Sequence, residues 1–282
     1  MAEAKAQKKE LTFHLMVVQL VEKIVEFFKG LLNTKLLAFC IKWLTLIGHF
    51  AILVAAVLGF LFALIFAIRT NQLDVFLYGF GWLILIFIAQ YIARQFLPVG
   101  ETLIKNNPTQ LASKAFLDCF GLLVLIGGLI SLIMGIINAI RIGSLEVFLS
   151  GLASFLLMAF LALVSFNPDD INIKIVKNNP AGQEAIGIVT FFIKGFMKLV
   201  PIFFGVFIVL GTIFLFIDFI GLFGSLMRLD RVWFSGYQNA QNILGAAFLP
   251  FAAYLIFVLA YLVIDVIKSI LSIPEKLDKL GK

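Results

Sequence analysis

Residues 67–79 read AIRTNQLDVFLYG, and residues 139–151 read AIRIGSLEVFLSG. The two stretches lie 72 residues apart, and the same register aligns the KNNP of residues 105–108 with the KNNP of residues 177–180. Over residues 67–108 this register gives 13 identities in 42 positions without a gap. Several of the identical residues are Arg, Asn, Pro and Gly, which an apolar composition would not supply by itself. The chain therefore contains an internal repeat.

The composition places this repeat in a membrane. Of the 282 residues, 62% are hydrophobic and only 13% are charged. A soluble domain carries about 45–50% apolar and about 25% charged residues, so this chain has too few polar side chains to cover a globule in water. That excludes a soluble enzyme, a secreted disulfide scaffold and a disordered chain. No disulfide is expected, because Cys40 and Cys119 both lie in apolar sequence.

Six apolar segments surround the repeated motifs, and each reaches or exceeds the roughly 20 residues that a helix needs to cross the hydrocarbon layer. We place the segments at 43–68, 73–97, 113–140, 145–166, 201–227 and 243–267. No segment shows the alternation of a transmembrane strand. The sequence therefore predicts an all-α integral membrane protein with six transmembrane helices, arranged as three parallel two-helix hairpin repeats that follow an N-terminal amphipathic helix.

The third copy of the motif is looser, LDRVWFSG at residues 229–236. Because each unit crosses the membrane twice, every unit begins on the same side of the membrane. Two arrangements are compatible with this, a pseudo-threefold ring of hairpins or a row of hairpins. The third unit also has about 15 extra residues. We expect residues 186–200 to form an interfacial helix that turns into the membrane at Pro201, and residues 231–242 to cap the outer surface. The expected parts are an amphipathic helix at 1–35, hairpin repeats at 36–104, 105–176 and 177–272, and a basic tail at 273–282.

The amphipathic helix and the basic residues predict how the chain meets the membrane surface. Apolar side chains recur every three or four residues from Leu11 to Leu32, and Lys and Glu share the other face, so this helix fits a protein groove as well as lipid. If the six helices alternate, 18 of the 22 basic residues fall on the side of the two termini. The positive-inside rule then places both termini in the cytoplasm of a bacterium, with the inner membrane as the expected location, or in the mitochondrial matrix.

The repeated polar residues have structural interpretations. Asn107 with Pro108, and Asn179 with Pro180, suit helix caps, since Asn accepts from first-turn amides and Pro has no donor to lose. Two further pairs flank the short outer turns, where they can form ion pairs across the hairpin or reach the headgroups. These pairs are Arg69 with Asp74, and Arg141 with Glu146.

Three polar residues within the predicted spans form a candidate intramembrane polar site. Asp218 is a carboxylate in an apolar segment, and an intramembrane acid must be protonated, face a polar cavity or meet a cation. It is a functional candidate, although an interhelical hydrogen bond also explains it. His49 and Gln90 are intramembrane polar residues with the same two explanations.

Catalytic and cofactor motifs are missing from the sequence. The two histidines, His14 and His49, and the two cysteines do not form a zinc or haem ligand set at recognisable spacing. No nucleophile elbow, phosphate-binding loop or dinucleotide fingerprint occurs. The basic residues form no stripe with interleaved aromatic residues, so nucleic acid is not an expected partner. We therefore expect no catalytic residue, no metal site and no cofactor.

Two hypotheses for function follow from these patterns. In the first, the protein is a non-enzymatic scaffold or accessory subunit of a larger membrane complex, with membrane lipids and protein partners, or further copies of itself, as its contacts. In the second, the hairpins surround a pathway for a small solute, and Asp218 with Gln90 or His49 couples a proton or cation to transport. The scarcity of buried polar residues favours the first hypothesis.

Overall fold

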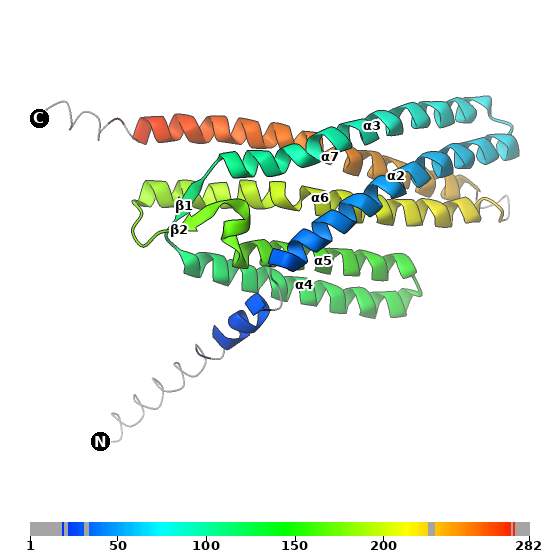
Figure 1. Cartoon of the computed structure of the whole chain (residues 1–282). Helices are drawn as coiled ribbons and strands as arrows, with labels where there is room; N and C mark the ends of the chain where they lie inside the picture. The colour runs from blue at the N-terminus through cyan, green and yellow to red at the C-terminus, as the bar shows by residue number, and fades with distance from the viewer. Residues whose placement is uncertain (1–18, 20–21, 31–33, 225–228, 272, 274–282) are drawn as a thin grey trace, which may run out of the picture.

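The computed structural model describes residues 19, 22–30, 34–224, 229–271 and 273, and it is built almost entirely of helices. Six long helices follow one another along the chain (Figure 1). They are α2 (Thr34–Thr70), α3 (Leu73–Asn106), α4 (Lys114–Ile142), α5 (Leu145–Phe166), α6 (Ala181–Gly221) and α7 (Leu229–Leu271). Each is long and apolar enough to cross a membrane. This confirms the prediction of an all-helical integral membrane protein with six crossings.

The helices are joined at two opposite ends of the molecule (Figure 1). The turns from α2 to α3 and from α4 to α5 lie at one end, with the end of α6 and the start of α7; we call it the turn end. At the other end, the sheet end, lie strands β1 (Thr109–Leu111) and β2 (Ile173–Ile175) and the 3-10 helix η1 (Pro168–Ile171). The strands pair in parallel, with Thr109 opposite Ile173. The sequence did not predict this short sheet.

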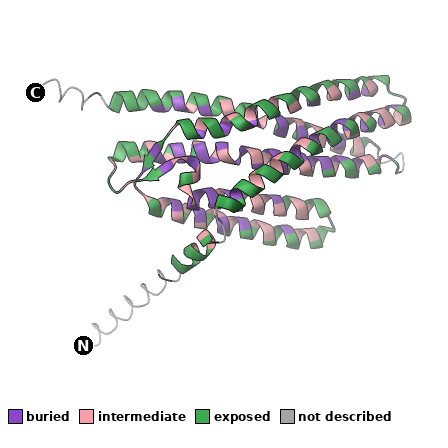
Figure 2. Ribbon diagram, viewed as in Figure 1, coloured by how far each residue is buried: buried purple, intermediate pink, exposed green. Residues whose placement is uncertain are grey.

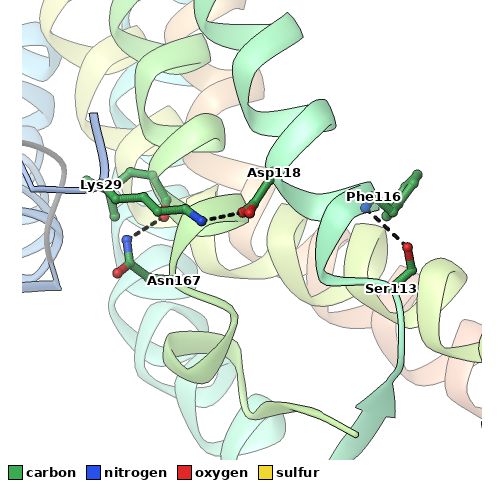
Figure 3. Close-up of polar contacts among 6 residues, drawn as sticks. Lys29, Ser113, Phe116, Asp118 and Asn167 are labelled. Carbon is green, nitrogen blue, oxygen red and sulfur yellow. Dashed lines mark hydrogen bonds and ion pairs between the residues drawn. The ribbon is translucent and has the colours of Figure 1, made fainter. Parts of the chain in front are cut away.

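The first predicted cap is wrong. Asn107 ends α3 instead of starting a helix, and its side-chain amide donates to the Leu103 carbonyl at 2.8 Å. Pro108 leads from Asn107 into β1. The next helix, α4, is capped by Ser113, whose hydroxyl accepts from the Phe116 amide at 3.2 Å (Figure 3). A short strand thus separates the repeated motif from the helix that it was expected to begin.

The second predicted cap lies at a helix start but works differently. Pro180 precedes the first residue of α6 by one position, and it makes no side-chain cap. The Asn179 side-chain amide donates to Glu184 Oε2 at 3.2 Å. The same carboxylate accepts from the backbone amides of Ala112 and Ser113, at 2.6 and 2.9 Å. Asn179 therefore orients a carboxylate that holds the start of α4, and it does not accept from the amides of α6.

The third hairpin consists of two continuous helices, without the separate segments that the sequence predicted. The helix α6 runs without a break from Ala181 to Gly221, with Pro201 inside it, so residues 186–200 do not form a separate interfacial helix. Residues 231–242 belong to the first turns of α7 and do not form a separate cap. Neighbouring helices re-satisfy the backbone groups that an intrahelical proline frees, which is why membrane helices tolerate it.

The order of the hairpins in space differs from their order in the sequence. The helices α2, α3, α7 and α6 form a ring in which each packs against the next. The α4–α5 hairpin joins this ring mainly through α5 against α6. The α6–α7 hairpin therefore lies between the other two. Buried residues face the interior of this arrangement and exposed residues cover its outer faces (Figure 2).

Small residues set how closely the helices approach. A Cβ placed on Gly151 of α5 would lie 2.7 Å from the Cα of Gly135 in α4, and one on Gly79 of α3 would lie 3.1 Å from the Cβ of Ala63 in α2. Both are contacts between the two arms of one hairpin. Gly236 of α7 differs, because it faces the Phe62 ring of α2 and not the other arm of its own hairpin.

We predict that Gly151→Leu destabilises the protein by about 2 kcal/mol, because the new side chain would overlap the α4 backbone. Thermal unfolding in detergent, followed by loss of helical circular dichroism, measures the effect. The matched control is Gly81→Leu on α3, where a Cβ meets nothing within 4 Å. Equal stability of the two variants would contradict the close approach of α4 and α5.

Candidate functional site

The structure divides the three predicted intramembrane polar residues between two places. His49 of α2 and Gln90 of α3 form one contact, in which the Gln90 Oε1 accepts from His49 Nδ1 at 3.0 Å. The His49 ring also lies against Phe204 of α6, with the ring centres 5.0 Å apart. This contact ties three helices of the ring together. The structure does not bring Asp218 to it.

Asp218 lies three residues from the last residue of α6, so it is only about 5 Å of helix from the turn end and less deep than the sequence suggested. Its side chain is buried between α6 and α7. The Asp218 Oδ2 accepts from the Ser235 hydroxyl at 3.1 Å and from the Asn239 side-chain amide at 2.8 Å. Two donors on one turn of α7 thus hold the carboxylate in an interhelical hydrogen bond.

A groove of about 610 Å³ lies beside this carboxylate, between α5, α6 and α7. Asn239, which donates to Asp218, also lines the groove. The other polar lining residues are Ser150 and Ser154 from α5, with Gln241 and Asn242 from α7. The remaining wall includes the small residues Ala153, Gly211, Gly245 and Ala246. The groove therefore combines hydrogen-bonding side chains with one exposed glycine, Gly245, at which another backbone can come close.

The sequence contained a partial signal for this groove. It assigned residues 231–242, which include Asn239, Gln241 and Asn242, to a cap on the outer surface, because it did not extend the last helix back to Leu229. Ser150 and Ser154 lie one turn apart on α5 and gave no signal of their own. Only the packing of the α4–α5 hairpin on α6 brings these two sets of residues together.

The predicted ion pairs at the outer turns are not formed. Among the residues that the structure describes, Arg69 and Asp74 do not come within ion-pair distance, and neither do Arg141 and Glu146. The Arg69 guanidinium instead donates to the Gly224 carbonyl at 3.2 and 3.3 Å. This contact joins the end of α2 to the turn that follows α6, three residues after its last residue Gly221.

A buried lysine at the sheet end was not predicted as a site residue. Lys194 of α6 is fully buried, and its Nζ donates to the Asn172 carbonyl at 3.0 Å. The same carbonyl accepts from the Thr109 amide at 3.2 Å, and the Asn172 side chain donates to the Lys105 carbonyl at 2.8 Å. Asn172 therefore joins α3, β1 and α6. The sequence showed Lys194 as one polar residue in an apolar run, without its acceptor.

The described part of the predicted amphipathic helix packs on the protein. Residues 22–30 are helical, and the Nζ of Lys29 lies 2.7 Å from Oδ1 of Asp118 on α4 (Figure 3). The same Nζ lies 5.8 Å from the centre of the Phe166 ring on α5. Val25 and Phe28 pack against the core. The apolar positions before residue 19 lie outside the described residues.

The described part of the chain contains no group of three or more His, Cys, Asp and Glu side chains that could hold a metal ion. Comparison of the chain with protein-family models, with curated proteins and with solved structures gives no match in any of the three. The geometry of the grooves and of the paired polar groups is therefore the basis for inferring function.

We predict that Asn239→Leu lowers stability by about 1–2 kcal/mol, because Asp218 loses one of its two donors inside the protein. Asp218→Asn should cost less, since its amide oxygen still accepts. A double-mutant cycle with Asp218→Leu, measured by thermal unfolding in detergent, isolates the coupling between the two side chains. Gln241→Leu is the control, as Gln241 is exposed and two residues further along α7. A coupling of zero would contradict the hydrogen bond.

Proposed function

We propose that this chain is a non-enzymatic scaffold or accessory subunit that binds a transmembrane helix of a partner protein in the groove between α5, α6 and α7. The observation that carries this proposal is the lining of that groove. Its Gly245 leaves room for a close backbone, and exposed Ser150 and Asn242 offer hydrogen bonds. Small residues and such polar side chains are what membrane helices use to associate, because lipid provides no hydrophobic force between them.

The shape of the groove supports a helix as its occupant. A Cβ on Gly245 meets no atom within 4 Å, so the α7 backbone is open at this point. The groove is bordered by Ser154 on one side and by Asn242 on the other. An approaching helix would therefore find a backbone to pack against and a donor or acceptor at each border.

The transport hypothesis has less support. It needs the intramembrane polar residues to face one common pathway. His49 lines a cavity between α2, α3 and α6, whereas Asn239, the partner of Asp218, lines the groove between α5, α6 and α7. His49 is hydrogen-bonded to Gln90, and Asp218 to Ser235 and Asn239. These hydrogen bonds explain the polar residues as contacts that hold neighbouring helices together.

We predict that a photo-crosslinking amino acid at Gly245, introduced into the full chain in its native membrane, forms one discrete adduct with a helix of a single partner. Ser154→Leu on the opposite border should abolish the adduct by filling the groove. The same amino acid at Gly81 of α3 is the matched control and should give no such adduct. Native mass spectrometry then identifies the occupant. Recovery of the chain as a lone monomer without an adduct would reject the proposal, and an adduct with a second copy would make the occupant a further copy.

We further propose that the three hairpins are copies of one unit, that the protein resides in a bacterial inner membrane and that both termini are cytoplasmic. The repeated sequences at residues 67–79 and 139–151 support common descent. The basic residues support the orientation, since Lys105, Lys114 and Lys174 lie at the sheet end. Arg69 and Arg141 lie at the turn end.

We predict that an impermeant thiol reagent labels a Lys177→Cys variant only from the cytoplasmic side and a Ser144→Cys variant only from the other side. Both variants carry Cys40→Ser and Cys119→Ser, so that the introduced thiol is the one that reacts. Intact and inverted vesicles distinguish the two sides. Labelling of both variants from one compartment would contradict the hairpin topology.

A further inference from the structure

A second cavity lies between α2, α3 and α6 and has a volume of about 420 Å³. It is separate from the groove between α5, α6 and α7, which we call the partner groove. Its three charged residues, Lys42, Glu101 and Lys198, each lie on a different helix. Lys42 is eight residues, or about 12 Å, from the start of α2, and Leu46 lies one turn deeper. On α3, Glu101 likewise lies one turn nearer the sheet end than Leu97. On α6, Pro201 lies about one turn deeper than Lys198, so each charged residue of the cavity has an apolar lining residue one turn deeper.

Two ammonium groups in this cavity have no partner among the described residues. Lys42 is exposed and Lys198 of α6 is half-buried, and neither forms an ion pair or hydrogen bond with the described part of the chain. The Thr45 hydroxyl, also in the cavity wall, is buried and lacks a hydrogen-bond partner there. Two ammonium groups thus line one cavity without an acceptor among the described residues.

Among the described residues, no carboxylate forms an ion pair with either lysine. Glu101 lies 3.1 Å from the Nζ of Lys105 on the same helix, and Lys198 is within electrostatic range of Glu101 without reaching ion-pair distance. Asp170 of η1 is within electrostatic range of Lys198, but burial raises the pKa of Asp170 and so disfavours its charged form. Lys42 and Lys198 remain available to an anion.

We propose that this cavity binds an anionic phospholipid, with the phosphate between Lys42 and Lys198 and an acyl chain against Leu46, Leu97 and Pro201. A phosphate would accept from both ammonium groups, and charge-assisted hydrogen bonds of this kind are the strong ones. The apolar depth of the cavity favours a lipid over a free anion, because an ion would leave that depth unfilled. The inference does not depend on the partner groove, which lies against other helices.

Native mass spectrometry of the purified full chain in detergent tests this site with phosphatidylglycerol, and with phosphatidylcholine of the same chains. We expect one phosphatidylglycerol to be retained in preference to phosphatidylcholine. The double variant Lys42→Gln with Lys198→Gln should weaken phosphatidylglycerol binding at least about tenfold. The matched control, Lys35→Gln with Lys174→Gln, removes two exposed lysines from the same end and should leave binding unchanged.

A second variant and a second ligand separate a lipid from a free anion. Leu46→Trp narrows the apolar part and keeps both lysines, so it should weaken retention of the lipid. Inorganic phosphate at millimolar concentration should not displace the lipid. Displacement by phosphate, or full retention by Leu46→Trp, would show that the site takes a free anion and would overturn the proposal. Equal loss of phosphatidylglycerol binding in the two double variants would show that the effect comes from general surface charge, and it would overturn the proposal.

Discussion

The absence of water from the bilayer interior is the constraint on which this structure depends. Every backbone amide there must find an acceptor inside the protein, and the six long helices satisfy that requirement within themselves. Association of the helices then relies on close packing. At Gly151 and Gly135, and at Gly79 and Ala63, the arms of two hairpins approach closely enough that larger side chains would not fit.

Polar side chains within the spans serve this packing. His49 meets Gln90 across α2 and α3, and the Asp218 carboxylate meets Ser235 and Asn239 across α6 and α7. The Thr212 hydroxyl of α6 lies 3.3 Å from the Ala51 carbonyl of α2. Each such contact joins two helices, so together they stabilise the ring of four. The groove between α5, α6 and α7 and the cavity between α2, α3 and α6 contain further polar side chains that these contacts do not use.

The two ends of the molecule differ in structure as well as in charge. At the turn end, Arg69 of α2 donates to the carbonyl of Gly224 in the turn that follows α6. At the sheet end, β1, η1 and β2 lie between the helices. There Asn172 forms hydrogen bonds with Lys105 of α3, Thr109 of β1 and Lys194 of α6. This end carries most of the described lysines, and each charged residue of the cavity between α2, α3 and α6 lies one turn nearer to it than an apolar lining residue. Basic and apolar side chains thus meet in this cavity.

The sequence by itself determined the helical membrane class, the number of crossings and the turn positions near Arg69 and Arg141. These properties depend on local hydropathy and on segment length, which a chain carries whatever its neighbours are. It also identified Asp218, His49 and Gln90 as intramembrane polar residues. It failed at Asn107, because a strand intervenes before α4, and at Pro201, because a helix among helices tolerates proline.

Only the tertiary structure decided which helices are neighbours. It separated Asp218 from His49, placed the α6–α7 hairpin between the other two, and brought Ser150 of α5 beside Asn242 of α7. Lipid is as apolar as the helices, so hydropathy cannot rank one apolar face against another. Shape complementarity between small residues and interhelical hydrogen bonds select the neighbours, and both depend on side chains far apart in the sequence.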